Sequence, residues 1–109
     1  MMIMRIPTNR PPTHPGEILR EEFLIPMRIT QQELAKHLKM PYQRINEIVN
    51  EKRGISESTA LRLSKFFGTS VEFWLNLQIA CNLYDVQKKE SEILESIDRF
   101  SESKTLVAC

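Results

Sequence analysis

A short stretch in the first half of the chain carries side chains that could read DNA bases. They are Tyr42, Gln43, Arg44, Asn46 and Glu47. Glutamine and asparagine can form two hydrogen bonds with adenine, arginine can do so with guanine, and glutamate can accept from the amino group of cytosine. Set outward at the start of a helix, these residue types suit contact with base edges in a major groove. We therefore take them as candidate base-contacting residues, although Tyr42 could instead pack on phosphate and sugar, and Glu47 could orient Arg44 or another donor.

Three further side chains flank this stretch and could bind the phosphate backbone. Gln31 lies at the predicted start of the preceding helix, where backbone N–H groups at the helix N-terminus favour an anion. Lys52 and Arg53 lie in the polar segment from Asn50 to Gly54 and could neutralise phosphates. A solvated helix face and a charged loop would carry the same residue types, so the surrounding elements must decide between these interpretations.

Two predicted helices joined by a very short link must position these side chains. Thr30 followed by Glu33 forms a capping box that opens the first helix, and Pro41 starts the second after the link Lys39-Met40. A steep crossing of two helices needs a small residue where the backbones meet, which is Ala35, and large apolar residues on both inward faces. These apolar residues are Leu34, Leu38, Met40, Ile45 and Ile48, and Val49 is a further buried residue of the second helix. The pattern predicts a helix-turn-helix at roughly residues 30–50.

Another helix is predicted before this pair. It begins near Pro15, because proline suits the first helical turn, and His14 is a candidate cap. Pro26 is expected to end it at about Ile25, because the residue before a proline is pushed away from helical geometry.

Cap signals and apolar spacing predict more helices after the pair. Ser56 opens one helix, which ends at Gly68. Thr69 followed by Glu72 reads as a second capping box, opening a helix that closes with Leu83 and Tyr84. A last amphipathic helix is predicted from the spacing of Ile93, Ile97 and Phe100.

These elements predict an all-α fold, a compact bundle of about five helices followed by a C-terminal helix and tail. A chain of 109 residues suffices for one compact domain. We expect an irregular N-terminal arm over residues 1–13, which is rich in proline, and a helix-turn-helix DNA-binding domain over residues 14–84. Residues 85–109 are expected to form the C-terminal helix and a loose tail.

Composition argues against several classes of protein. No apolar run approaches the roughly 20 residues of a membrane span, so we expect no membrane association and a cytoplasmic location. Cys81 and Cys109 lack metal-ligand spacing, and His14 and His37 lack carboxylate or thiol neighbours, so no metal or cofactor is expected. No nucleophile elbow, phosphate loop or acid–base pair is present, so we expect no enzyme. A net charge of +1 excludes a histone-like protein, but it leaves DNA binding open.

The predicted helix after Thr69 is apolar on several sides. Trp74 is expected to pack in the core, yet a domain of this size cannot cover every side of such a helix. Part of it and the last helix are therefore expected to form a homodimer interface. The candidate interface residues are Leu77, Ile79, Leu83, Ile93 and Ile97.

The central segment TQQELAKHLKMPYQRINEIVNEKRGIS resembles the phage-repressor-like helix-turn-helix family. The match covers Gln31, Ala35, the inward apolar positions and the loop that follows. Lys39 departs from the family, which usually has glycine in the turn. Lysine can adopt the left-handed conformation at a cost of about 1 kcal/mol, so we expect a turn that is either strained or slightly rebuilt.

A narrower resemblance spans about residues 12–84. PTHPGEIL, PYQRINEIVNEKRGIS and FFGTSVEFWLNLQ together resemble the HigA/VapI group of antitoxins. The resemblance implies a dimer that binds operator DNA and represses its own operon. It also implies a partner toxin protein, typically a ribosome-dependent mRNA endonuclease, which the antitoxin neutralises.

Two alternatives remain open from the sequence. One is a transcriptional regulator of the same fold without a toxin partner. The other is a helical protein-interaction module that no longer binds DNA.

Overall fold

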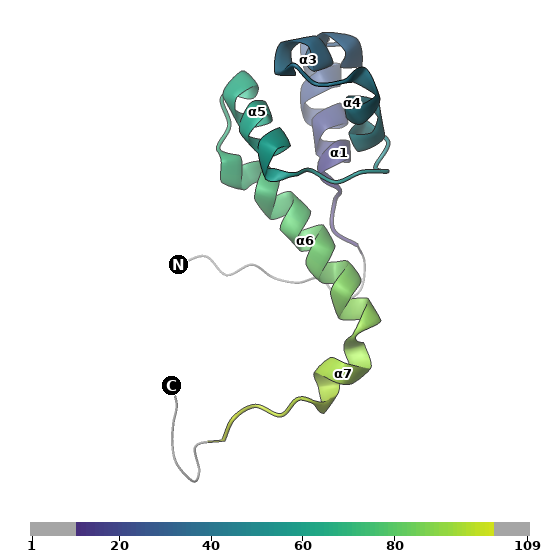
Figure 1. Cartoon of the computed structure of the whole chain (residues 1–109), viewed down its shortest axis with the longest axis vertical. Coiled ribbons are helices and arrows are strands. Elements are labelled where there is room, and N and C mark those ends of the chain that lie inside the picture. The colour runs from purple at the N-terminus through teal and green to yellow at the C-terminus, as the bar shows by residue number, and fades with distance from the viewer. Residues whose placement is uncertain (1–10, 102–109) are drawn as a thin grey trace.

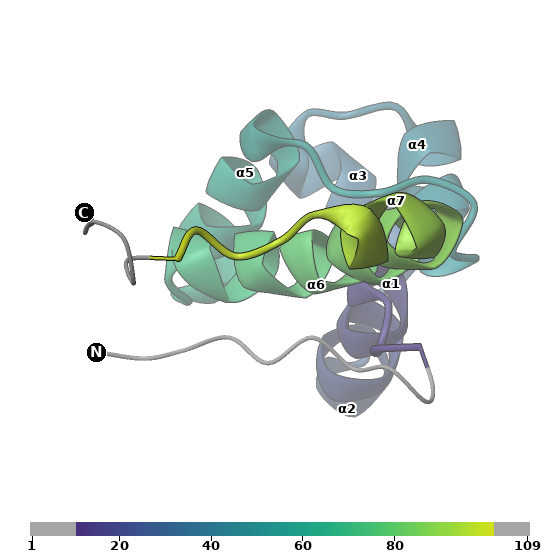
Figure 2. The same ribbon diagram turned by 90° about the horizontal axis from the view of Figure 1, so that it is seen from below.

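The computed structural model describes residues 11–101, so most of the predicted N-terminal arm and the tail after Ser101 lie outside the described residues. This part of the chain is all-helical and contains no strand. The elements are α1 (Pro15–Ile18), the π-helical segment η1 (Leu19–Leu24), α2 (Ile25–Met27), α3 (Gln31–Leu38), α4 (Tyr42–Val49), α5 (Glu57–Phe67), α6 (Val71–Lys89) and α7 (Ser91–Ser96). Helices α1–α5 gather at one end, while α6 extends away from them and carries α7 at its far end (Figure 1). Viewed from below, α7 lies in front of this bundle (Figure 2).

One hydrophobic core holds the bundle together. The side chains with 0% relative exposure are Leu19, Leu34, Ile45, Ile48, Ala60, Leu63 and Trp74. They come from η1, α3, α4, α5 and α6, and burying each large one contributes roughly 1.5–3 kcal/mol. The expected core position of Trp74 is confirmed, and its indole N–H donates to Oγ1 of Thr69 at 2.7 Å.

Helices α1 and α4 meet backbone to backbone at Gly16. A Cβ at this position would overlap the carbonyl group of Ile48. Glycine is therefore required here for close packing, and α4 is held against α1 at its buried side.

The first helical stretch is longer than the sequence predicted. It continues through Pro26 to Met27 instead of ending at Ile25. A proline cannot donate to the carbonyl four residues earlier, and its ring clashes with that carbonyl in a regular α-helix. The preceding turn is widened, because the N–H of Ile25 donates to the carbonyl of Arg20, five residues earlier. This π-helical turn explains how the chain passes Pro26 without breaking.

Most of the predicted caps are confirmed. Nδ1 of His14 accepts from the N–H of Gly16 at 2.8 Å, and both bonds of the Thr30 capping box are present. Ser56 caps α5, which ends at Gly68 in the left-handed conformation. The prediction of a second capping box at Thr69 was wrong. Ser70 caps α6, because the hydroxyl of Thr69 instead accepts the hydrogen bond of the Trp74 indole.

The C-terminal helices differ in extent from the prediction. Helix α6 continues past Tyr84 to Lys89, because residues 85–89 contain no glycine or proline and Lys88 and Lys89 favour a helix C-terminus. Helix α7 ends at Ser96, so Ile97 and Phe100 lie beyond it. It buries no residue, and a helix this short is marginal without packing.

Candidate nucleic-acid interface

The turn between α3 and α4 is tight although it contains no glycine. Lys39 has φ 57° and ψ 48°, so of the two open alternatives the turn takes the left-handed one. The N–H groups of Lys39 and Met40 donate to the carbonyls of Lys36 and Ala35 at 3.2 and 2.9 Å. Arg62 supports the turn from α5, because its Nη1 donates to the carbonyls of Leu38 and Lys39 at 3.0 and 2.9 Å. These bonds fix the start of α4 relative to α3.

One side of α4 is buried and the other is open to solvent. Ile45 and Ile48 are fully buried and Val49 is 2% exposed. The five candidate base-contacting residues lie outside this buried stripe. Tyr42, Gln43 and Arg44 are exposed, whereas Asn46 and Glu47 are partly buried.

Asn46 joins the start of α3 to the outer side of α4. Its Nδ2 donates to Oε1 of Gln31 at 2.9 Å and lies 3.5 Å from Oη of Tyr42. Its Oδ1 accepts from Nδ2 of Asn50 at 3.2 Å. Both ends of the Asn46 amide are therefore engaged within the protein, and the amide positions Gln31 beside the outer side of α4.

Glu47 binds Arg53 of the following loop. Oε1 of Glu47 accepts from Nε of Arg53 at 2.7 Å, and Oε2 accepts from Nε2 of Gln43 at 3.4 Å. The hydrogen bond from Arg53 is the main cause that holds the pKa of Glu47 below its ordinary value. The side chain of Arg44 makes no hydrogen bond or ion pair with residues 11–101, so its guanidinium is available to a ligand.

The loop after α4 is held from two sides. Nη1 of Arg20 donates to the carbonyl of Val49 at 2.8 Å, and Nη2 of Arg20 lies 3.9 Å from the carboxylate of Glu51. The backbone of Glu51 has a positive φ of 61°. From α6, Oε1 of Gln78 accepts from the N–H of Ile55 at 2.7 Å. The loop between these contacts carries the exposed Lys52 and Arg53.

Sequence patterns missed the side chains that support this interface. Arg20 lies 29 residues from Val49, Gln78 lies 23 from Ile55, and Arg62 lies 24 from Leu38. Periodicity and cap signals report contacts within about one helical turn, so they carry no signal for such distant pairs. A glycine at position 54 is the one local feature that reflects the contact of Gln78 with this loop, because a Cβ at Gly54 would lie 2.6 Å from Oε1 of Gln78.

Comparison with known proteins places this geometry in a family. A family model described as helix-turn-helix matches residues 19–74. Virulence-associated protein I of Dichelobacter nodosus is 49% identical over 92 residues, which cover 82% of each chain. The structure of the Pseudomonas aeruginosa antitoxin HigA with the higBA promoter is 42% identical with a TM-score of 0.75, covering 81% of this chain and 96% of that one. This chain belongs to the HigA/VapI family of helix-turn-helix antitoxins.

A second HigA-type structure is similar over most of the chain. Antitoxin GraA in complex with its operator is 40% identical with a TM-score of 0.77, covering 89% of this chain and 99% of that one. The family consists of DNA-binding regulators rather than enzymes. Within residues 11–101, no helix is long and apolar enough to cross a membrane, and no three His, Cys, Asp or Glu side chains are grouped as metal ligands.

The residues suggested for a dimer interface fall into two groups in this HigA-type fold. Leu77 is partly buried and packs against the core of its own chain. The other four have large exposed fractions: Ile79 42%, Leu83 38%, Ile93 61% and Ile97 64%. Helix α6 and the segment after it therefore present apolar surface that the described chain leaves uncovered.

Proposed function

We propose that this protein is an operator-binding antitoxin that represses its own toxin–antitoxin operon. The observation that carries the proposal is the outer side of α4, where side chains able to bond bases lie beside candidate phosphate ligands on a rigid scaffold. Arg44 is open to solvent, Gln31 is held beside Asn46, and the loop with Lys52 and Arg53 is fixed from two sides. Solved structures of relatives of the same fold contain a promoter and an operator, which supports this assignment.

In this proposal, α4 enters the major groove with its N-terminal residues toward the base edges. Tyr42, Gln43 and Arg44 lie at that end. The bond between Asn46 and Gln31 is kept, so that the Nε2 amide of Gln31 can donate to a phosphate while Asn46 faces the bases. Lys52 and Arg53 neutralise phosphates on the flank. Glu47 acts through Arg53, whose guanidinium it holds at 2.7 Å.

A titration of the purified protein against the DNA upstream of its gene tests this proposal, with a scrambled duplex as the control. Specific binding should exceed that of the control by at least ~10³-fold. Equal and weak binding to both duplexes would overturn operator recognition and would favour the protein-interaction module.

We further propose that the protein acts as a homodimer and neutralises a partner toxin, an mRNA endonuclease. The exposed apolar side chains of α6, among them Ile79 and Leu83, support a dimer, because such surface is normally covered in a working assembly. Two copies would place two α4 helices in successive major grooves, about 34–36 Å apart.

Co-expression with the product of the adjacent gene tests the toxin partner. We expect growth arrest by that product alone, relief when this chain is present, and a complex of the two proteins on size-exclusion chromatography. Relief by an unrelated helix-turn-helix protein, or the absence of any growth arrest, would leave a regulator without a toxin partner.

A further inference from the structure

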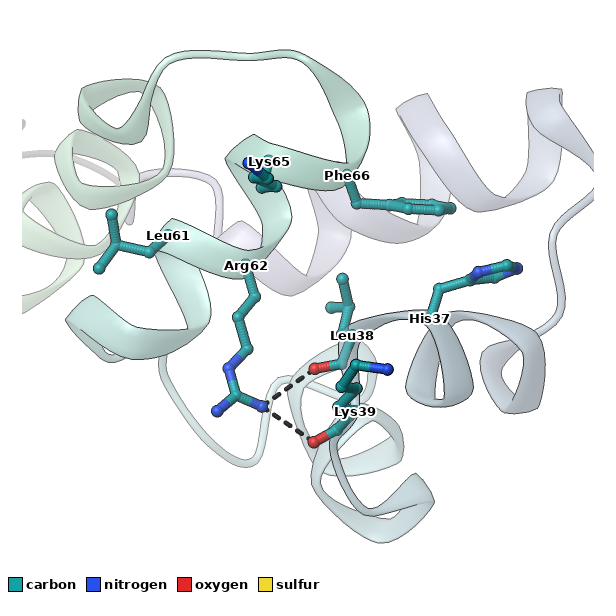
Figure 3. Close-up of a pocket in the computed structure, with 7 residues that line it drawn as sticks. All are labelled: His37, Leu38, Lys39, Leu61, Arg62, Lys65 and Phe66. Atoms are coloured by element: carbon teal, nitrogen blue, oxygen red, sulfur yellow. Dashed lines mark hydrogen bonds between the residues drawn. The ribbon is translucent and has the colours of Figure 1, made fainter.

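An open groove lies between the C-terminal end of α3 and helix α5 (Figure 3). Its volume is about 640 Å³. The lining residues are His37, Leu38, Lys39, Leu61, Arg62, Lys65 and Phe66. Three of them carry a full positive charge and none is acidic, although the whole chain has a net charge of only +1. The α3/α5 groove is therefore a local concentration of positive charge.

The groove also presents apolar surface on a fixed frame. Leu61 is 56% exposed and Phe66 is 36% exposed. The ring of Phe66 stacks on His37 with 5.0 Å between the centroids, and Arg62 is tied to two backbone carbonyls (Figure 3). A ligand for this groove should combine carboxylates with apolar side chains.

The groove is separate from Gln31, the candidate phosphate ligand on α3, although its lining residue Lys39 lies three positions before Tyr42. It lies at the C-terminal end of α3, whereas Gln31 lies at the other end of this helix of eight residues. Eight helical residues span about 12 Å. The exposed Leu61 and Phe66 would meet only water and sugar on a phosphate backbone, so an apolar partner fits the groove better than DNA does.

The chain itself contains a segment with the matching chemistry. We call residues 90–98 the α7 segment, because they include α7 and its flanks. It carries the carboxylates of Glu90, Glu92, Glu95 and Asp98 and no basic residue. Its apolar side chains are Ile93, Leu94 and Ile97, which are 61%, 43% and 64% exposed.

The α7 segment cannot reach the groove of its own chain in this structure. It lies at the far end of α6, away from α3 and α5 (Figure 1). The N-terminal part of helix α6 packs on the bundle through Trp74 and Gln78, and the remaining residues 79–89 correspond to about 16 Å of rigid rod between bundle and segment. Every residue from 88 to 101 is exposed, so the segment is free to meet another molecule.

We propose that the α7 segment of one copy docks in the α3/α5 groove of a second copy. The exchange is reciprocal, so two copies close a dimer with two such contacts. The carboxylates of the segment face Lys39, Arg62 and Lys65, and its apolar side chains cover Leu61 and Phe66. The inference rests on the homodimer of the proposed function, and it adds the pairing of two surfaces that are far apart in one chain.

Charge reversal on each surface tests the pairing by sedimentation equilibrium at low salt. One variant carries Glu92→Lys and Glu95→Lys, and the other carries Lys39→Glu and Lys65→Glu. Each variant alone should dimerise at least about tenfold more weakly than the wild type, because two charges that attracted the facing surface now repel it at each of the two contacts. An equimolar mixture should recover dimers, since in a mixed pair both contacts join opposite charges.

Exposed residues outside both surfaces provide matched controls. Glu22→Lys and Lys36→Glu each reverse one charge of the same kind, half the change of the corresponding double variant, and should leave dimerisation unchanged; circular dichroism checks that each variant folds. Wild-type-like dimers of both reversal variants, or no recovery in the mixture, would overturn the docking and leave the proposed function intact. A wild type that stays monomeric would overturn both the docking and the homodimer of the proposed function. Reversal variants that lose affinity for scrambled DNA but dimerise normally would assign the groove to phosphate and overturn the docking.

Discussion

The side chains on the outer side of α4 are already held by one another in the absence of DNA. Asn46 bonds Gln31, Tyr42 and Asn50, and Glu47 holds Arg53. Such mutual bonds reduce the side-chain freedom that is lost on binding, which favours affinity when the bound geometry is similar. The residues therefore divide into those that position others and those, such as Arg44, that are free to contact a base.

At Lys52 we expect a phosphate contact without sequence information. Lys52→Ala should weaken binding to every duplex by the same factor and reduce the slope of log K against log salt by about one. Titrations at several salt concentrations measure this slope, with Lys36→Ala as a control that removes another exposed charge, outside the interface. A loss confined to the operator would show that Lys52 reads bases.

At Glu47 the structure predicts a measurable titration. Its pKa is lowered chiefly by the hydrogen bond from Arg53, so the pair stabilises the fold above the ordinary glutamate pKa. That stabilisation is lost as the pH falls through the lowered pKa of the folded state. NMR titration of the Glu47 carboxylate should give a midpoint below the ordinary value, and Arg53→Ala should raise it. An unchanged midpoint in the variant would contradict the assigned cause.

At the scale of elements, the packing of α1 on α4 depends on one glycine. Gly16→Ala would force a Cβ into the backbone carbonyl of Ile48, which cannot move without shifting α4. We expect a loss of about 2–3 kcal/mol in the free energy of unfolding, measured by urea denaturation. Gly54→Ala is the matched control: its Cβ meets the flexible end of Gln78, so the loss should be smaller. Equal losses would argue against a rigid α1–α4 contact.

The elements also show what the sequence could predict. Caps at His14, Thr30 and Ser56 follow from local chemistry, because a cap bonds a backbone group two or three residues away. The inward faces of α3 and α4 follow from the spacing of apolar residues. These two local signals were enough to place the candidate interface on the outer side of α4.

The failures have a common physical origin in contacts beyond the local pattern. Thr69 was predicted as a cap, yet its hydroxyl serves the indole of Trp74. Pro26 was predicted to stop a helix, yet a π-helical turn accommodates it. The roles of Arg20, Arg62 and Gln78 depend on partners more than 20 residues away, as the separations 29, 24 and 23 show. None of these arrangements produces a periodic pattern of residues in the sequence.

At the scale of the whole molecule, the proposed dimer fixes the spacing of the two operator halves. Two copies of α4 joined through a rigid dimer should match half-sites separated by one helical turn, about 10–10.5 base pairs. Insertion of five base pairs between the halves turns one half-site to the opposite side of the DNA. We expect affinity to fall at least about 100-fold, whereas an insertion of ten base pairs should be less harmful. Insensitivity to both insertions would indicate independent monomers.

The central claim is that the outer side of α4 reads base sequence, and Arg44 offers the most direct test of it. The measurement is the affinity of the wild type and of Arg44→Ala for the operator and for each single-base substitution of it. The variant should lose about 1–3 kcal/mol on the intact operator and should stop discriminating at one base pair, while its preferences elsewhere stay as in the wild type. A variant that keeps the complete base preference of the wild type, or that weakens equally on all sequences, would contradict the account.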